Sequence, residues 1–183
     1  MCGADLGHHG GVRTVELRRH TDNEGDALSE QGVRDAESIG REGLHPPYAA
    51  FVSTGASRAT EMLTILRHSA GQDEVPVTTQ AALRSTVEDR WREAAKAAGK
   101  GASVEDMRAV DPDLVEHECR LLGSALGRVI DALPEGGRAL VVGHSPTNEA
   151  AVLGLTGQLV GPMGKGEGVL VTEEAGRFAV RSL

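Results

Sequence analysis

Three short runs, the first rich in β-branched residues and the other two apolar, constrain the fold more than any other feature of this chain. They read VRTVEL, AAFVST and ALVVGH, span residues 12–17, 49–54 and 139–144, and are typical of buried or half-buried strands. Segments with helical spacing lie between them. This alternation predicts an α/β fold, a three-layer α/β/α sandwich with a mostly parallel central sheet. We expect a single domain over 12–183, preceded by a flexible leader over 1–11.

The helical segments begin at recognisable caps. Ser29 is placed to cap a helix that carries apolar residues to Leu44, and Asp111 followed by Pro112 opens a long helix that ends before the Pro134 turn. The remaining predicted helices start at 56, cover 88–98 and 104–110, and start at Ser145-Pro146. The segment 168–183 predicts two closing strands around a Glu-Ala-Gly turn.

Composition excludes several classes of function. The 183 residues carry a net charge of −8, only 2% are aromatic, and no Lys/Arg run is present, which argues against nucleic-acid binding. The apolar runs are too short to span a membrane, and the leader lacks the regions of a signal peptide. Cys2 and Cys119 form no disulfide framework, and His8-His9 beside Cys2 lacks a second cluster of metal ligands. We therefore expect a cytoplasmic protein without membrane partner, metal or cofactor.

Basic side chains gather where the predicted strands end. Arg18, Arg19 and His20 follow the first strand, Arg58 lies in the first helical turn after the second, and His144 ends the third. The carboxyl ends of parallel strands meet at one edge of a sheet, where ligands bind. Guanidinium groups bind phosphoryl oxygens bidentately, and their charge disfavours the imidazolium form, so a nearby histidine stays neutral and nucleophilic.

These residues carry a family resemblance. The segments LRRHT, LSEQGVRDAESIG, VSTGASRATEML and LVVGHSPTNEAAVLGLTG resemble, in this order, the histidine phosphatase superfamily, also called phosphoglycerate mutase-like. The short chain and the GHSP helix are most similar to the small SixA-type phosphohistidine phosphatases. The resemblance covers roughly 12–70 and 137–172. It implies that His20 is the nucleophile and that Arg19, Arg58 and His144 hold the phosphoryl group.

Two positions at the first strand depart from the family pattern. The family usually has a small residue after the nucleophile, whereas this chain has Thr21, which would either crowd the phosphate or donate a hydroxyl hydrogen bond to it. Arg18 stands where the family has an apolar residue. It would either extend the basic site or lie outside it, at the surface or paired with an acid such as Glu16.

The proton donor for the leaving oxygen is a further departure. In ALRSTVEDRW, Ser85 stands where mutase-like relatives place a Glu, and Trp91 matches their aromatic residue. Glu88 is the candidate acid if burial raises its pKa, and Asp89 is a second; the alternative is that both are solvated carboxylates. SixA-type relatives also lack this Glu, so its absence would favour substrates with good leaving groups.

The segment GPMGKGEG, residues 161–168, either forms a flexible connection or brings Lys165 to the substrate. The sequence thus predicts a phosphatase that acts on a phosphorylated small molecule or phosphoprotein through a phospho-His20 intermediate. A mutase would need an ordered lid over 84–110, against which the Gly99-Lys100-Gly101 break argues. The rival from another class is a module that binds a phospholigand without catalysis.

Overall fold

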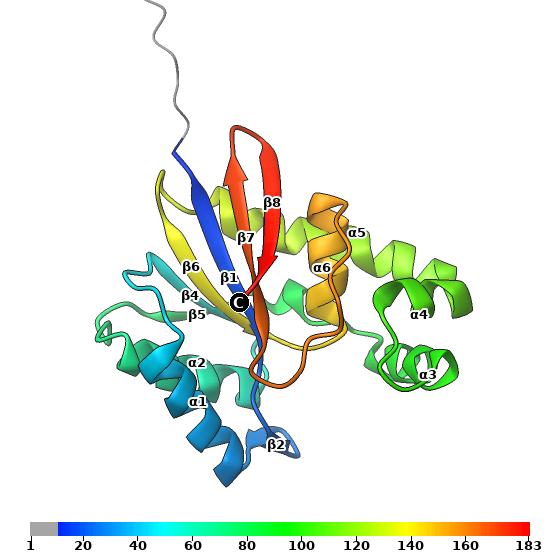
Figure 1. The fold of residues 1–183 in the computed structure, drawn as a ribbon, viewed down its shortest axis with the longest axis horizontal. Helices are drawn as coiled ribbons and strands as arrows, with labels where there is room; N and C mark the ends of the chain where they lie inside the picture. Colours follow the sequence, from blue (N-terminus) through cyan, green and yellow to red (C-terminus); the bar gives the residue numbers. More distant parts are fainter. Residues whose placement is uncertain (1–10) are drawn as a thin grey trace, which may run out of the picture.

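The computed structural model describes residues 11–183 and centres on a six-stranded sheet with the order β5-β4-β6-β1-β7-β8 (Figure 1). These strands are β1 (Arg13–Arg19), β4 (Ala50–Ser53), β5 (Val77–Thr79), β6 (Arg138–Gly143), β7 (Gly168–Glu174) and β8 (Arg177–Ser182). Strands β1, β4, β5 and β6 pair in parallel, whereas β7 and β8 are antiparallel. The predicted mostly parallel sheet is confirmed.

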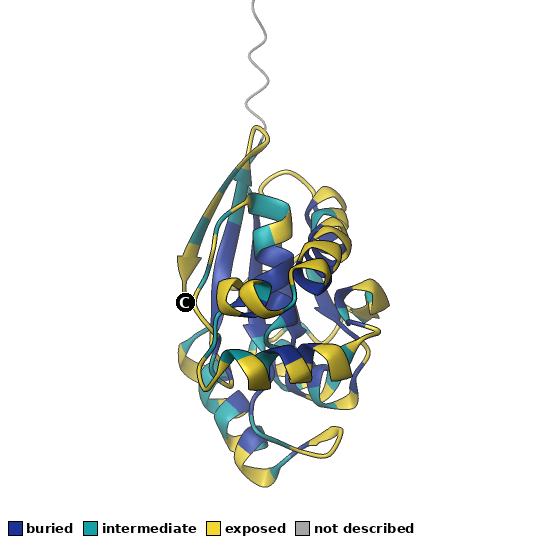
Figure 2. Cartoon of the chain, turned by 90° about the vertical axis from the view of Figure 1, so that its right-hand side faces the viewer, coloured by how far each residue is buried: buried dark blue, intermediate teal, exposed yellow. Residues whose placement is uncertain are grey.

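Helices cover both faces of this sheet. They are α1 (Glu30–Glu42), α2 (Ser57–Ser69), α3 (Glu88–Ala98), α4 (Val104–Val110), α5 (Pro112–Asp131) and α6 (Thr147–Thr156), with a 3-10 turn η1 (Ala81–Leu83). One buried apolar cluster joins α1 and α2 to the sheet, and a larger one joins α3 to α6 to its other face. Figure 2 shows buried residues along the central strands and exposed residues on the outer sides of the helices. The three-layer prediction is therefore confirmed.

Local signals account for most element boundaries. The Ser29 hydroxyl accepts a hydrogen bond from the Gly32 amide at 3.0 Å and caps α1, and Asp111 caps α5, whose first residue is Pro112. The predicted first helix is two residues too long, since α1 ends at Glu42. A short hairpin of β2 (Asn23–Glu24) and β3 (Ala27–Leu28) forms after β1, where the sequence analysis expected no strand.

Residues 1–10 lie outside the described residues, and with them most of the predicted leader, Cys2 and the His8-His9 pair. Cys119 is a free, buried thiol on α5. Within 11–183, no helix has both the length and the apolar character needed to cross a membrane.

Candidate active site

A pocket of about 290 Å³ opens where the carboxyl ends of β1, β4 and β6 meet. His20, Arg58 and His144 line it from three different segments, which are the segments that the sequence predicted to meet. The first turns of α3 close the opposite side with Glu88 and Trp91. The pocket therefore combines a basic floor with a wall from the region 84–110.

His20 lies directly after β1 and is held in one tautomer. Its Nδ1 lies 2.7 Å from the Thr21 carbonyl oxygen, which can only accept, so Nδ1 carries the proton and Nε2 has a free lone pair. Arg58 Nε donates to this Nε2 over 3.2 Å. Burial lowers the pKa of His20 to about 4, and the charges of Arg58 and Arg19 add to this effect. The hydrogen bond to the Thr21 carbonyl oxygen acts in the opposite direction but is outweighed. His20 is thus neutral near pH 7.

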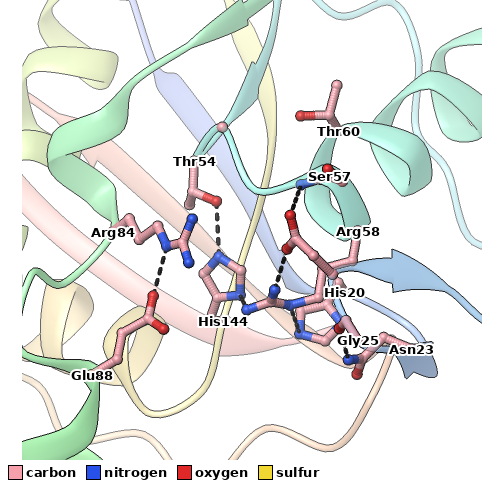
Figure 3. Close-up of polar contacts among 12 residues, drawn as sticks. His20, Asn23, Gly25, Thr54, Ser57, Arg58, Thr60, Arg84, Glu88 and His144 are labelled. Atoms are coloured by element: carbon pink, nitrogen blue, oxygen red, sulfur yellow. Dashed lines mark hydrogen bonds and ion pairs between the residues drawn. The ribbon is translucent and has the colours of Figure 1, made fainter.

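His144 follows β6 and has the opposite tautomer. Arg58 Nη2 donates to its Nδ1 over 3.3 Å, so the proton is on Nε2, which donates to Thr54 Oγ1 at 2.8 Å. Burial first, then the charge of Arg58, lowers the pKa of His144 to about 3. The two imidazole rings stand 5.3 Å apart between centroids. Figure 3 shows Arg58 between them.

Arg58 is held from behind by Asp26, in the turn between β2 and β3. The Asp26 carboxylate accepts from Arg58 Nη1 at 2.5 Å, and the Asp26 backbone carbonyl oxygen accepts from the Arg58 amide at 2.7 Å. Sequence reasoning missed Asp26 and Thr54. Thr54 ends a predicted strand, which is a usable signal for a site residue, whereas nothing in TDNEGD marks Asp26 as a partner of Arg58.

Arg19 and Arg18 separate because successive strand residues point to opposite faces. Arg19 Nη1 donates to the Met163 carbonyl oxygen at 2.8 Å, and its charge contributes to the lowered pKa of His20. Arg18 was among the predicted substrate-binding residues, but its side chain is engaged elsewhere in the structure. It pairs with Glu16 at 2.7 Å and donates to the carbonyl oxygens of Gly43 and Gly166, so the Glu16 alternative is the observed one.

Thr21 also differs from its predicted role as a phosphate ligand. Its hydroxyl donates to the Gly32 carbonyl oxygen at 2.7 Å, and the side chain is buried. Gly32 is the glycine of the LSEQG segment, and a Cβ there would overlap the Asp22 carbonyl oxygen. Helix α1 therefore packs directly against the chain after His20, and Thr21 holds this packing rather than facing the phosphate.

Glu88 reaches the pocket, but its pKa is not raised, which was the condition for it to act as the acid. Arg84 Nε donates to Glu88 Oε1 at 2.6 Å, and this hydrogen bond lowers the pKa of the carboxyl (Figure 3). A carboxylate stabilised in this way holds no proton to donate at neutral pH. Asp89 is exposed and pairs with Arg92. Ser85, in the place of the family Glu, lines the pocket and its hydroxyl accepts from the Val87 amide.

The segment 161–168 is bonded to the end of β1. The Gly166 amide donates to the carbonyl oxygens of Arg19 and His20, and Lys165 forms an ion pair with Asp22. Lys165 is thereby engaged outside the pocket, although its charge also helps to lower the pKa of His20. These contacts fix the connection against the strand that carries the histidine.

Comparison with solved structures identifies the fold. A phosphoglycerate mutase from Bacillus anthracis superposes with a TM-score of 0.66 at 19% identity, covering 96% of this chain and 94% of that chain. A mycobacterial glucosyl-3-phosphoglycerate phosphatase gives a TM-score of 0.62 at 16% identity, with 94% and 97% covered. A protein assigned as the phosphohistidine phosphatase SixA from Agrobacterium tumefaciens gives 0.53 at 16% identity, with 93% and 97% covered.

Neither a family model nor a curated protein sequence matches the chain. The likeness to SixA is not greater than the likeness to the mutase, so these comparisons do not single out the SixA branch. The superpositions nevertheless extend over more than nine-tenths of the chain in every case quoted. The chain thus has the phosphoglycerate mutase-like fold of the histidine phosphatases, as the resemblance of its four segments predicted.

Proposed function

We propose that this protein is a phosphatase that hydrolyses a phosphomonoester or phosphohistidine through a phospho-His20 intermediate. The observation that carries the proposal is the unprotonated Nε2 of His20, which faces a pocket that Arg58 and His144 also line. A neutral imidazole in a cationic pocket is a nucleophile beside an anion site. Phosphatases among the similar structures are consistent with this reading.

The proposed reaction has two displacements at phosphorus. The phosphoryl group binds between the two imidazoles, and Arg58 exchanges its contacts with the histidine nitrogens for contacts with phosphoryl oxygens. His20 Nε2 attacks phosphorus as the bond to the leaving oxygen breaks, and water then attacks the phosphohistidine. A loose transition state needs positioning and charge neutralisation above all. Arg19 and Arg58 supply the charge, and His144 helps to position the phosphoryl group.

Two observations keep alternative functions in view. Helices α3 and α4 are ordered on either side of the Gly99 break and close one side of the pocket, which removes the sequence argument against a mutase. A mutase would pass the phosphoryl group to a second hydroxyl compound rather than to water. The unavailability of a proton on Glu88 favours the other alternative, a module that binds a phospholigand without cleaving it.

The test compares wild type and His20→Ala on an aryl phosphate and on a phosphohistidine peptide, without added metal. The proposal predicts turnover by the wild type that disappears in the variant. Thermal stabilisation by phosphate without any turnover would instead indicate the binding module. Transfer of the phosphoryl group to 3-phosphoglycerate in preference to water would indicate the mutase.

A further inference from the structure

Glu149 is a buried carboxyl that the two-step reaction above does not use. It is the third residue of α6, and only 2% of it is exposed. Its Oε1 lies 2.6 Å from Ser145 Oγ and accepts from the Met163 amide at 2.7 Å. Its Oε2 is buried and has no hydrogen-bond partner within residues 11–183. Half of this carboxyl is thus left without the contacts that an ionised group needs.

The surroundings of Glu149 favour its protonated form. Hydrogen bonds from the Met163 amide and the Ser145 hydroxyl, the N-terminus of α6 and the charge of Arg19 from β1 all favour the carboxylate. Burial outweighs them and raises the pKa of Glu149. Arg19 is the charged side chain that faces it, and the guanidinium is partly engaged by the Met163 carbonyl oxygen. A proton on Glu149 therefore relieves the cost of burying an incompletely bonded carboxylate.

Ser145 connects this buried carboxyl to the pocket. It follows His144 directly and lines the pocket together with His20 and Arg58. A hydroxyl can accept one hydrogen bond while it donates another. When Glu149 is protonated on Oε1, the 2.6 Å contact reverses: the carboxyl donates to Ser145 Oγ, and the Ser145 hydrogen is free to point into the pocket.

We propose that Ser145 and Glu149 form the proton relay for the leaving oxygen, in place of the acid that mutase-like relatives carry at the position of Ser85. This proposal rests on the proposed phosphatase function. It assigns the catalytic contact to Ser145 and the storage of the proton to Glu149. It also changes the expected substrate class, because a relay allows cleavage of alkyl phosphates, whose alkoxides are poor leaving groups.

The relay balances over the cycle. In the first step His20 Nε2 forms the bond to phosphorus, the P–O bond breaks, Ser145 gives its proton to the leaving oxygen, and Glu149 gives its proton to Ser145. The products are an alcohol, phospho-His20 and the Glu149 carboxylate. In the second step water attacks phosphorus and the P–N bond breaks. The proton of the water returns through Ser145 to Glu149, so the sum is phosphate ester plus water to alcohol plus phosphate.

The test is the dependence of rate on the leaving group in wild type, Glu149→Gln and Ser145→Ala. The substrates are 2,4-dinitrophenyl phosphate, whose phenolate leaves without a proton, and β-glycerophosphate, whose alkoxide needs one. Both variants are expected to lose kcat/KM for β-glycerophosphate on the order of 10²-fold while retaining most of it for the dinitrophenyl ester. Ser145→Thr keeps a hydroxyl and is expected to restore part of the loss.

A merely structural role for Glu149 gives a different pattern. Loss of packing lowers the rates for both esters in the same proportion, as expected for the control Glu118→Gln, which removes another buried carboxyl of the same core. Equal losses in Ser145→Ala, which removes only a hydroxyl, would overturn the relay even if Glu149→Gln failed to fold. A wild type that cleaves only the dinitrophenyl ester would also overturn it, with the phosphatase function intact. No cleavage of either ester overturns the relay, and it contradicts the phosphatase function as well when the phosphohistidine peptide is also left intact.

Discussion

Two buried polar clusters lie along and beyond β1, and they differ in how completely their groups are bonded. In the first, Glu16 accepts from Arg18 at 2.7 Å and from the Tyr48 hydroxyl at 2.6 Å, and Arg18 also donates to two carbonyl oxygens. In the second, two neutral histidines share one arginine, whose carboxylate partner Asp26 lies at the edge. In the first cluster the positive charge of Arg18 is paired with the negative charge of Glu16. In the second cluster the basic groups face an open pocket.

The difference shows why two arginines that the sequence predicted for one site have different roles. Arg18 is buried with a carboxylate of its own and holds the sheet to the loop after α1. Arg58 faces solvent in the pocket, and its contacts to the histidine nitrogens are long, at 3.2 and 3.3 Å. Weakly bonded donors are those that a phosphoryl group can recruit. The fully hydrogen-bonded pair of Arg18 and Glu16 therefore has a structural role, whereas the long contacts of Arg58 leave its guanidinium available to a ligand.

The largest expected effect is on stability, in the first cluster. Arg18→Ala leaves the Glu16 carboxylate buried without its counter-ion, so the free energy of unfolding is expected to fall by about 3–5 kcal/mol. Urea denaturation measures this, with the exposed Arg34→Ala as control, for which a change within about 0.5 kcal/mol is expected. A stable Arg18→Ala protein with a greatly reduced kcat/KM would mean that Arg18 acts in the active site. The difference proposed between the two clusters would then be wrong.

Arg58→Ala tests the second cluster and is expected to affect rate rather than stability. The loss of the guanidinium that touches both histidines should lower kcat/KM for an aryl phosphate on the order of 10²–10³-fold. Arg67→Ala, on the same helix but away from the pocket, is the matched control. The melting temperature of both variants reports folding. An unchanged rate in Arg58→Ala would remove the proposed site.

The histidines also predict how stability depends on pH. Their folded pKa values of about 4 and 3 lie below the ordinary 6.5, so the unfolded chain binds protons that the folded chain does not. Stability is therefore lost as pH falls below 6.5, by at most about 1.4 kcal/mol per pH unit for each histidine, and levels off below the folded pKa values. Urea midpoints at pH 7.5 and 5 should fall more for wild type than for His20→Asn/His144→Asn. Equal declines would mean that the histidines are not held neutral.

The smallest expected effect concerns Thr54. Thr54→Val removes the hydroxyl that accepts from His144 Nε2 at 2.8 Å, so His144 is less firmly held and kcat/KM should fall by about fivefold, or about 1 kcal/mol. Thr64→Val, exposed on α2, is the control. Steady-state kinetics on an aryl phosphate measure both. A loss as large as that in Arg58→Ala would show that Thr54 touches the substrate itself.

The sequence predicted the location of those site residues whose place follows from the order of the strands. His20, Arg58 and His144 meet because parallel strands place their carboxyl ends at one edge, and the apolar runs mark those strands clearly. The faces of a strand follow from its alternation, and the sequence offered Glu16 as a partner for Arg18. Whether this pair would form away from the site depended on Tyr48, which bonds to Glu16, and on the loop at Gly43, which bonds to Arg18. Such contacts join distant segments, and no local pattern encodes them.

The pKa of Glu88 could not be predicted from the sequence for a related reason. Its position at the start of a helix near the pocket was predictable, but its pKa depends on Arg84, one turn away, whose side chain could equally have extended into solvent. Glu149 went unnoticed because a carboxyl at the start of a helix is ordinarily exposed. Its burial arises from the loop that brings the Met163 amide across α6, which only the folded chain shows.

The most direct test of the central claim is to trap the phosphoenzyme. The protein is mixed with a slight excess of 2,4-dinitrophenyl phosphate, quenched in alkali within one turnover, digested, and its peptides are sequenced by mass spectrometry. Our account predicts an acid-labile, alkali-stable phosphate on the peptide that contains His20, absent from His20→Ala. Wild-type turnover with no phosphate on His20 at any time, or with phosphate on another residue, would contradict it.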